Sequence, residues 1–318
     1  MTLVQNRLLQ TAIPESDGLE SHVGDTPLLP LRRIGLTRNL PPSVDIFAKA
    51  EWFNPGGSVK DRPALNIIRT AIANGDLYPG KRLLDSTSGN MGISYATFGA
   101  ALGIPVTLTM PENASSERIS ILRALGAELI LTDPLEGSDG AILEARKLVA
   151  EKSDLYWYAN QYDNPANWLA HYVSTGPEIW HQTNGQVTHF IAGLGTSGTM
   201  TGVGKYLREM NPSVQLIAIQ PDDAFHGLEG LKHMGTAIKP GIYDVDFADH
   251  TVGVSTEDAH AMVLRLAREE GLFVGISSGA AAVATLQVAS KLESGQVVTV
   301  FPDAGYKYLS DKSIWEKA

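Results

Sequence analysis

The sequence predicts an α/β protein of two lobes, each with a mostly parallel sheet flanked by helices. Three observations favour this fold. The chain has 318 residues, which is more than one small hydrophobic core usually organises. Short apolar or β-branched segments alternate with longer segments of helical periodicity, a pattern typical of parallel sheets covered by helices. A loop-rich stretch at 160–167 interrupts this alternation, which then resumes.

The first half of the chain supplies strands and helices in turn. Strands are expected at 44–52, 82–84, 106–110 and 129–132, and helices at 59–73, 89–102, 116–125 and 139–152. Gly103 and Gly126 stand where the second and third helices end, a position that glycine favours. Pro111 closes the third strand.

The second half repeats the pattern. Strands are expected at 188–192, 215–219 and 297–301, and helices at 199–210, 256–270 and 278–292. In the helix at 256–270 the apolar residues recur at helical spacing, as Ala259, Met262, Val263 and Leu266. Ser255 and Asp258 fit a capping box at its start.

These elements predict a division into two domains. The smaller, 49–170, carries the loop around Asn90, and the larger, 1–48 with 171–318, carries the glycine-rich loop at 193–199. We expect the ligand site in the cleft between them.

Composition excludes several classes of function. The net charge of -10 and a pI near 5.3 argue against a nucleic-acid partner, which requires clustered Lys and Arg. The absence of cysteine excludes a disulfide framework and thiolate sites, and the eight histidines form no HExxH pattern, so no metal site is expected. No apolar run has the length of a signal peptide or a membrane span, which predicts a cytoplasmic protein with no membrane partner.

Lys60 is the first candidate for chemistry. It ends the segment Asn-Pro-Gly-Gly-Ser-Val-Lys, where an apolar strand gives way to a glycine-rich turn and an expected helix. A lysine forms a Schiff base only through its neutral amine, although its usual pKa is about 10.4. The positive end of a helix dipole disfavours the ammonium form, so this position suits a Schiff-base lysine. The alternative is an ordinary solvated lysine.

Two further turns combine hydroxyls or glycines with an expected helix start. The segment 86–92, Ser-Thr-Ser-Gly-Asn-Met-Gly, suits a carboxylate or phenolate oxygen, although a simple helix cap has the same composition. The segment 193–199, Gly-Leu-Gly-Thr-Ser-Gly-Thr, suits a phosphate, with a tight steric turn as its alternative.

The same glycines also fit G-x-G-x-x-G, the dinucleotide fingerprint. Asp222 and Asp223 follow the next strand, where a ribose-binding acid would stand, so an NAD-dependent dehydrogenase is a competing interpretation. The fingerprint usually opens the first βαβ unit of its domain, whereas here a separate α/β lobe precedes it. The hydroxyls of Thr196, Ser197 and Thr199 also favour a single phosphate monoester.

The segment 275–279, Gly-Ile-Ser-Ser-Gly, precedes another expected helix. A serine hydroxyl is a neutral partner for a ring nitrogen, unlike an aspartate, which would keep that nitrogen protonated. A plain helix cap is the alternative.

Taken together, these segments resemble the cysteine synthase family, in particular the B-type O-acetylserine sulfhydrylases, which are pyridoxal-phosphate enzymes of the tryptophan-synthase-β fold type. The resemblance covers nearly the whole chain, from Gly-Asp-Thr-Pro-Leu at 24–28 to Gly-Tyr-Lys-Tyr-Leu-Ser at 305–310, and the motifs come in the family's order. Thr-Gly-Pro-Glu-Ile-Trp at 175–180 is a further match, and 54–63 and 220–223 look closest to the B-type enzymes.

The resemblance implies a role for each site residue. Lys60 would hold the cofactor covalently and act as the catalytic base, Asn90 would bond its phenolic oxygen, and Ser277, rather than Ser278, would face its pyridine nitrogen. The cofactor phosphate would be held by Gly195, Thr196, Ser197, Gly198 and Thr199. The substrate carboxylate would be held by Thr87, Ser88, Gly89, Met91 and Gln161.

The implied reaction is β-replacement on an activated L-serine, with O-acetylserine favoured, in which sulfide completes L-cysteine. The implied enzyme is a homodimer, and the sequence does not decide whether a serine acetyltransferase docks on it. Met91 replaces the threonine of typical cysteine synthases, as in the β-cyanoalanine synthase branch, so sulfide and cyanide stay open as nucleophiles. A short cystathionine β-synthase, with homocysteine, is a further alternative. Some B-type relatives that prefer O-phosphoserine have an arginine in the stretch that corresponds to 222–226, where this chain has Asp222 and Asp223, and these acids disfavour that donor. Lys232, His226 and His233 would reverse this preference if they fold inward.

Overall fold

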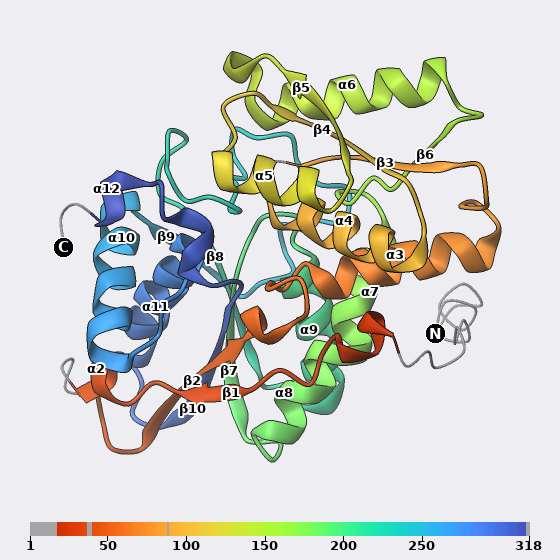
Figure 1. Cartoon of the computed structure of the whole chain (residues 1–318). Coiled ribbons are helices and arrows are strands. Elements are labelled where there is room, and N and C mark those ends of the chain that lie inside the picture. The colour runs from red at the N-terminus through yellow and green to blue at the C-terminus, as the bar shows by residue number, and fades with distance from the viewer. Residues whose placement is uncertain (1–17, 37–39, 88, 316–318) are drawn as a thin grey trace. The chain divides into compact units, whose positions relative to one another are not determined.

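The computed structural model describes residues 18–36, 40–87 and 89–315, and these form two compact units (Figure 1). The small unit is the described part of Met1–Val23 with Lys60–Asn167, and the large unit is Gly24–Val59 with the described part of Trp168–Ala318. The division predicted from the sequence placed 49–59 and 168–170 in the smaller part and 1–23 in the larger part. In the structure 49–59 and 168–170 belong to the large unit, where the Val59 N–H donates to the Pro302 carbonyl over 2.8 Å, whereas 18–23 belongs to the small unit.

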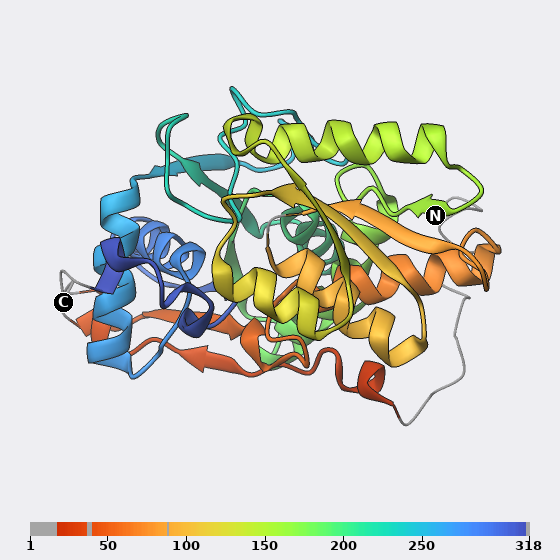
Figure 2. The ribbon, with the colours of Figure 1, turned by 45° about the horizontal axis from the view of Figure 1, so that its top comes forward.

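The small unit contains a sheet of four parallel strands in the order β5-β4-β3-β6. Its strands are β3 (Arg82–Ser86), β4 (Val106–Pro111), β5 (Glu128–Thr132) and β6 (Tyr156–Tyr158), and its helices are α3 (Asp61–Asn74), α4 (Asn90–Leu102), α5 (Ser116–Ala124) and α6 (Gly137–Glu151), with short 3-10 turns η1 (Leu19–His22) and η3 (Pro134–Glu136). Alternate side chains face opposite ways: Leu83 joins the core under α3, α4 and α5, whereas Leu84 packs under α6. Helices therefore cover both faces of this sheet (Figures 1 and 2).

The large unit contains a six-stranded sheet in the order β1-β2-β10-β7-β8-β9, in which only the pairing of β1 with β2 is antiparallel. Its strands are β1 (Leu28–Pro30), β2 (Val44–Ala50), β7 (Val187–Gly193), β8 (Gln215–Pro221), β9 (His250–Val254) and β10 (Gly295–Phe301). Its helices are α2 (Arg33–Leu36), α8 (Gly176–Gln182), α9 (Gly198–Met210), α10 (Thr256–Arg265), α11 (Ile276–Ala289) and α12 (Lys312–Trp315), with turns η2 (Glu51–Phe53), η4 (His171–Thr175), η5 (Leu266–Glu270) and η6 (Gly305–Tyr308). The helix α7 (Pro165–Ala170) contains the point at which the chain returns to this unit.

The two faces of the larger sheet also carry separate cores. Val297 and Ile191 pack with α10 and α11, whereas Val298 and Phe190 pack with α8 and α9. The predicted fold class, α/β with two mostly parallel sheets flanked by helices, is confirmed. No helix within 18–36, 40–87 or 89–315 has both the length and the apolar character needed to cross a membrane.

Local signals located most elements but missed the short ones. The N-cap half of the expected capping box is confirmed, because the Ser255 hydroxyl accepts the N–H of Asp258 over 3.1 Å. The helix expected at 256–270 is α10 continued by the π-helical turn η5. The strands β1 and β6 have three residues each, which is too few to show the alternation of apolar and polar residues by which a strand is predicted. The edge strand β9 is largely exposed and lacks an apolar alternation.

Candidate active site

Lys60 precedes the first turn of α3 and is partly exposed. Its carbonyl accepts the N–H of Ala64 over 3.0 Å, which starts the helix. The next residue, Asp61, is fully buried and accepts a hydrogen bond of 2.5 Å from the hydroxyl of Ser94 on α4. Because Ser94 lies one turn after Asn90, this bond ties the start of α3, with Lys60, to the first turns of α4. A carboxylate at Asp61 also suits the helix dipole.

The loop before α4 is held by the side chain of Thr87. Its hydroxyl oxygen accepts the N–H of Gly89 over 3.2 Å and the N–H of Gly92 over 3.3 Å. Two donors thus occupy the oxygen lone pairs, and the hydroxyl hydrogen can serve an anionic acceptor. Gly92 is needed for this arrangement, since a Cβ there would lie 2.7 Å from the Thr87 methyl group. The predicted residue Ser88 lies outside the described residues.

Gln161 is brought to the same loop from a distant part of the chain. Its side-chain amide donates to the Ser86 carbonyl over 2.9 Å, and its backbone N–H donates to Asp85 Oδ2 over 3.2 Å. Met91, the second residue of α4, is 2% exposed and packs into the apolar core of the small unit. The structure therefore groups Thr87, Gly89, Asn90, Met91 and Gln161 around the start of α4, whereas the sequence alone gave no distance between Gln161 and the rest.

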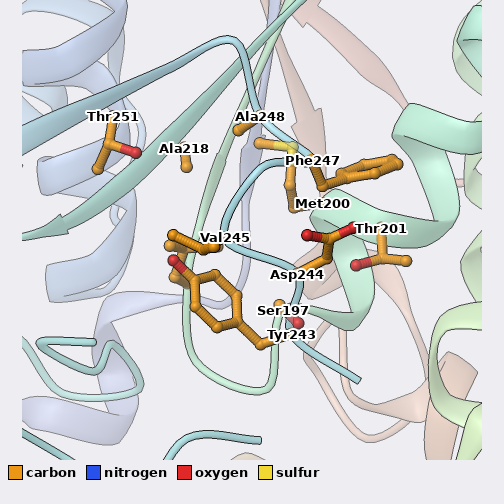
Figure 3. Close-up of a pocket in the computed structure, with 11 residues that line it drawn as sticks. Ser197, Met200, Thr201, Ala218, Tyr243, Asp244, Val245, Phe247, Ala248 and Thr251 are labelled. Carbon is orange, nitrogen blue, oxygen red and sulfur yellow. The ribbon is translucent and has the colours of Figure 1, made fainter. Parts of the chain in front are cut away.

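The glycine-rich loop of the large unit ends at the first turn of α9. Ser197 has a left-handed backbone with φ of 67°, and its hydroxyl is buried without a hydrogen-bond partner in the described part of the chain. Gly195 is packed so tightly that a Cβ would lie 2.4 Å from the Gly230 carbonyl oxygen. Ser197 also lies on the wall of a pocket with Met200 and Thr201 (Figure 3). A helix start, a strained turn and an unpartnered buried hydroxyl together suit an oxyanion.

His171 was not singled out from the sequence, yet it contacts this loop. It is fully buried in the π-helical turn η4, where Nδ1 lies 2.9 Å from the Thr175 hydroxyl and Nε2 lies 3.3 Å from the Thr199 hydroxyl. Its ring thus orients one of the predicted phosphate ligands. No local pattern could have found it, because a lone histidine in a helical segment is usually a core or surface residue.

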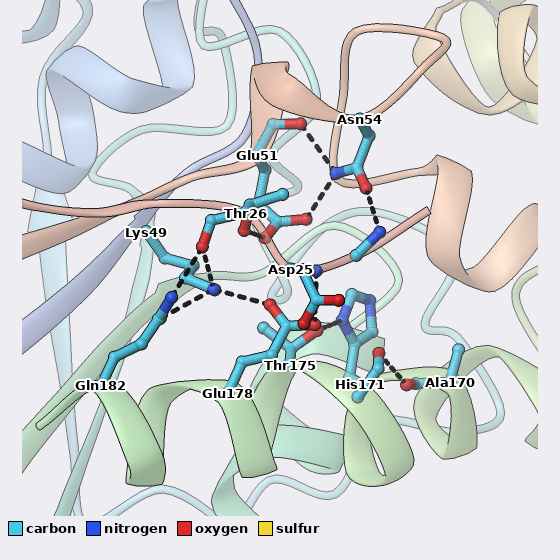
Figure 4. A network of polar contacts seen from close by, with 12 residues as sticks. Asp25, Thr26, Lys49, Glu51, Asn54, Ala170, His171, Thr175, Glu178 and Gln182 are labelled. Carbon is cyan, nitrogen blue, oxygen red and sulfur yellow. Dashed lines mark hydrogen bonds and ion pairs between the residues drawn. The ribbon is translucent and has the colours of Figure 1, made fainter. Parts of the chain in front are cut away.

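A buried network explains the Thr-Gly-Pro-Glu-Ile-Trp motif at 175–180 (Figure 4). The amine of Lys49, which is fully buried, donates to the Thr26 carbonyl over 2.5 Å and to the Gln182 side chain over 2.8 Å, and it pairs with Glu178 over 2.6 Å. Three acceptors satisfy the three N–H groups of the ammonium. Glu178 also accepts the N–H of Asp25 over 3.1 Å. The motif therefore fixes the Gly-Asp-Thr-Pro segment at 24–27 against α8.

The same network reaches the segment that leads to Lys60. Asn54 donates to the carbonyl and the carboxylate of Glu51, over 2.8 and 2.9 Å, and accepts the N–H of Gly24 over 2.9 Å. Further along, the buried amine of Lys307 donates to the carbonyls of Gly56 and Gly57, over 3.2 and 3.0 Å. The turn before Lys60 is thus held by side chains at both ends.

Two serines occupy the first turn of α11. Ser277, the predicted ring partner, is 8% exposed, whereas Ser278 is fully buried and its hydroxyl has no hydrogen-bond partner in the described part of the chain. Glycine is required at position 275, before this turn, because a Cβ there would lie 2.1 Å from Oδ1 of Asp303. The assignment to Ser277 stays a prediction, and Ser278 offers a second hydroxyl for the same purpose.

Comparison with protein families matches residues 19–303 to pyridoxal-phosphate dependent enzymes. A curated relative, the cysteine synthase of Aquifex aeolicus, is 54% identical over 91% of this chain and 89% of its own length. The chain belongs to the cysteine synthase family. Cysteine synthase B of Pseudomonas aeruginosa is 43% identical over 91% of this chain and 94% of its own length. The crystal structure of cysteine synthase (OASS) from Entamoeba histolytica superimposes with a TM-score of 0.88 at 37% identity, covering 95% of this chain and 91% of that one.

The cysteine synthase family uses pyridoxal phosphate, and the residues present fit that group. The buried hydroxyl of Ser197 has no partner within 18–36, 40–87 and 89–315, and a phosphate oxygen would supply an acceptor; the hydroxyl of Ser278 likewise has no partner among these residues. Both lie at helix starts, where backbone N–H groups favour an anion or a dipole. The NAD-dependent dehydrogenase is not favoured, because the family match assigns the glycine-rich loop to a pyridoxal-phosphate enzyme.

Proposed function

We propose that this cysteine synthase forms L-cysteine from O-acetylserine and sulfide. The observation that carries the proposal is the glycine-rich loop at the start of α9, where the buried Ser197 hydroxyl has no partner among the residues that the structure describes. The chain also places a partly exposed lysine at the start of α3. A phosphate-holding loop and a Schiff-base lysine are the two parts that a pyridoxal-phosphate site requires. The names of the relatives, cysteine synthase and cysteine synthase B, support the choice of product.

In this proposal Lys60 would hold the cofactor covalently and, as a free amine, would take the proton from the substrate α-carbon. Pyridoxal phosphate, when bound, would supply the electron sink that makes this proton acidic and the β-substituent easier to expel. Asn90 would donate to the phenolic oxygen, and Ser277 would be the neutral partner of the ring nitrogen. The phosphate would be held by five residues of the loop, Gly195, Thr196, Ser197, Gly198 and Thr199.

The substrate carboxylate is assigned to Thr87, Ser88, Gly89, Met91 and Gln161. Thr87 contributes a hydroxyl hydrogen, because its oxygen already accepts two backbone N–H groups. Met91 contributes its backbone only, since its side chain is buried in the apolar core. The proposed carboxylate-binding site therefore has one side-chain hydroxyl fewer than it would have with threonine at position 91, as in typical cysteine synthases.

The preference for O-acetylserine over O-phosphoserine rests on the loop that follows β8. This loop packs on the phosphate loop, where the N–H of Lys232 donates to the Leu194 carbonyl over 2.8 Å. Asp222 and Asp223 are both exposed at its start. Burial, followed by the charge of the nearby His233, lowers the pKa of His226 from its usual value, against the opposing effect of Asp222 and Asp223, which disfavours a positive charge on this ring. Two carboxylates beside a ring that resists protonation disfavour a phosphorylated donor.

A donor screen tests the proposal. Purified protein loaded with pyridoxal phosphate is given O-acetylserine, O-phosphoserine or L-serine, each with sulfide, cyanide or homocysteine, and the products are identified by mass spectrometry. We expect L-cysteine from O-acetylserine and sulfide, with kcat/KM at least about 100-fold above that for O-phosphoserine, a difference of about 2.7 kcal/mol. The control is Asp223→Arg, which should raise the use of O-phosphoserine. Preference for O-phosphoserine by the unaltered protein would refute the choice of donor.

The homodimer and the cytoplasmic location expected from the sequence are part of this proposal. Light scattering on the eluting protein measures the first, and fractionation of the source cells with immunoblotting measures the second. A pull-down with a serine acetyltransferase tests whether that enzyme binds this protein.

A further inference from the structure

Asp85 is the penultimate residue of β3, two positions before Thr87 in the loop assigned to the substrate carboxylate, and its side chain is fully buried. Its two oxygens bind two different segments. Oδ1 accepts the N–H of Ser86 over 2.8 Å, and Oδ2 accepts the N–H of Gln161 over 3.2 Å. One carboxylate therefore joins the start of the loop before α4 to a residue that follows β6.

Further contacts close this arrangement into a ring. The side-chain amide of Gln161 donates back to the Ser86 carbonyl over 2.9 Å, and Asn167 donates to the Gln161 carbonyl over 2.7 Å. Gln161 is 3% exposed and Asn167 is 1% exposed. A buried set of bonds in which each member restrains the others fixes geometry more strongly than separate contacts would.

We propose that Asp85 is a positioning residue, which sets the distance between Gln161 and Thr87 so that both reach one substrate carboxylate. The inference rests on the proposed function, because that function assigns Thr87 and Gln161 to the carboxylate. Asp85 acts through its two backbone contacts and is not itself a ligand of the substrate.

The surroundings of Asp85 make its ionisation sensitive to pH. The titratable groups that act on it are the Tyr95 hydroxyl from α4 and the Asp163 carboxylate. Burial raises the pKa of Asp85 to about 7, against the opposing effect of the Ser86 N–H, the Tyr95 hydroxyl and the Gln161 N–H, and the charge of Asp163 adds to the rise. The carboxylate is therefore partly protonated at neutral pH.

Three tyrosines adjoin Asp85 and remain neutral there. Burial, followed by the charge of Asp85, raises the pKa of Tyr95 well above 10, raises that of Tyr158 to about 12 and raises that of Tyr162 further. On α6, Arg146 acts on Tyr158 and Asp139 acts on Tyr162. Of Asp85 and these three tyrosines, Asp85 is the group whose pKa lies near 7, and its ionised form offers both oxygens purely as acceptors.

The first test is kinetic and compares the holoenzyme with Asp85→Asn, which keeps the size but exchanges one acceptor oxygen for a donor. We expect KM for O-acetylserine to rise about tenfold, with kcat within about threefold, as for the loss of one hydrogen bond to a charged group. In the unaltered enzyme KM should rise as pH falls below about 7, because protonation removes an acceptor. The variant should lack this pH dependence.

The second test needs neither cofactor nor substrate. Hydrogen exchange measured by mass spectrometry on cofactor-free Asp85→Asn should be at least about tenfold faster in peptides covering 86–91 and 161, and unchanged in the peptide covering 198–210. The matched control is Thr109→Val, which removes the buried bond from the Thr109 hydroxyl to the Ala141 carbonyl, 2.8 Å long, in the same sheet. It should leave KM and exchange at 161 unchanged.

The outcomes separate this inference from the proposed function. If the unaltered holoenzyme does not use O-acetylserine, the proposed function fails. If it does, and Asp85→Asn leaves KM, its pH dependence or the exchange at 86–91 and 161 as in the unaltered protein, the positioning role of Asp85 is overturned.

Discussion

The loop before α9 and the loop before α4 both present a helix start, yet they are held in different ways. Packing shapes the first: Gly195 is pressed against the Gly230 carbonyl, and Ser197 sits in a left-handed conformation that costs about 1 kcal/mol for a residue with a Cβ. Side-chain hydrogen bonds shape the second, through Thr87 and the ring of contacts made by Asp85 and Gln161.

This difference matches the ligands that we assign to the two loops. A phosphate can be held by backbone N–H groups and a helix dipole, so the first loop needs glycine where the backbone must come close. A substrate carboxylate that arrives and leaves in each cycle needs polar side chains at fixed distances. Steric changes should therefore damage the α9 loop, and polar changes should damage the α4 loop.

The largest effect is expected from substitution of Lys60, which lies in neither loop. It tests whether the loss of the catalytic amine can be distinguished from the loss of ligand binding by the loops. Lys60→Ala should lower kcat/KM at least about 1000-fold, or about 4 kcal/mol, because both the covalent attachment and the base are lost. Borohydride reduction of the unaltered protein with bound cofactor, followed by peptide mass spectrometry, should place the modification on Lys60. Modification of Lys49 or Lys307, which are buried and hydrogen-bonded, would contradict the assignment.

The next effect comes from Asp85, which holds the α4 loop, and is a change of the unfolding free energy with pH. A carboxyl whose pKa is raised from 3.8 to about 7 holds its proton more tightly in the folded state, so the unfolding free energy falls as pH rises through this window. The loss is on the order of 4 kcal/mol for Asp85, since each pKa unit is worth about 1.36 kcal/mol. Urea titrations of the cofactor-free protein from pH 4 to pH 8 measure it. A decline of equal size in Asp85→Asn would show that another group is responsible.

A steric change distinguishes the two loops at a smaller scale. Gly195→Ala should weaken pyridoxal-phosphate binding about 100-fold, since a Cβ 2.4 Å from a carbonyl oxygen forces the loop apart at a cost of about 1–3 kcal/mol. Gly89→Ala is the counterpart in the α4 loop, where the nearest atom would be 3.8 Å away, and it should change this affinity less than about threefold. Absorbance titration with the cofactor gives both values. Similar losses in the two variants would remove the distinction.

The smallest effect is expected from Ser197→Ala, which should weaken cofactor binding but raise the unfolding free energy of the cofactor-free protein. Ser197→Ala removes a buried hydroxyl that lacks a partner, so the cofactor-free protein should gain about 1 kcal/mol of unfolding free energy, whereas cofactor affinity should fall about fivefold. Thr87→Val should instead lower the unfolding free energy of the cofactor-free protein, because the hydroxyl oxygen of Thr87 accepts two backbone N–H groups. Thermal unfolding with and without cofactor measures both changes. A destabilised Ser197→Ala would mean that its hydroxyl is already bonded in the free protein.

The sequence by itself determined the fold class, the position of Lys60 and the three helix-start turns, because these depend on local signals. Alternating apolar segments, glycines at turns and hydroxyls at helix starts act within a few residues of themselves. The family resemblance added roles that no spacing could supply. The nicotinamide alternative, which the fingerprint alone left open, was removed by the family match.

Only the tertiary structure decided which distant residues meet within each unit. It placed Gln161 on Ser86, His171 on Thr199 and Asp85 between two backbone segments, and it showed that Met91 turns into the apolar core. The physical reason is that burial and hydrogen-bond partners are properties of the packed chain. An aspartate in a strand has an ordinary pKa until packing removes its water, and a lone histidine acquires a role only when folding brings it against a second hydroxyl.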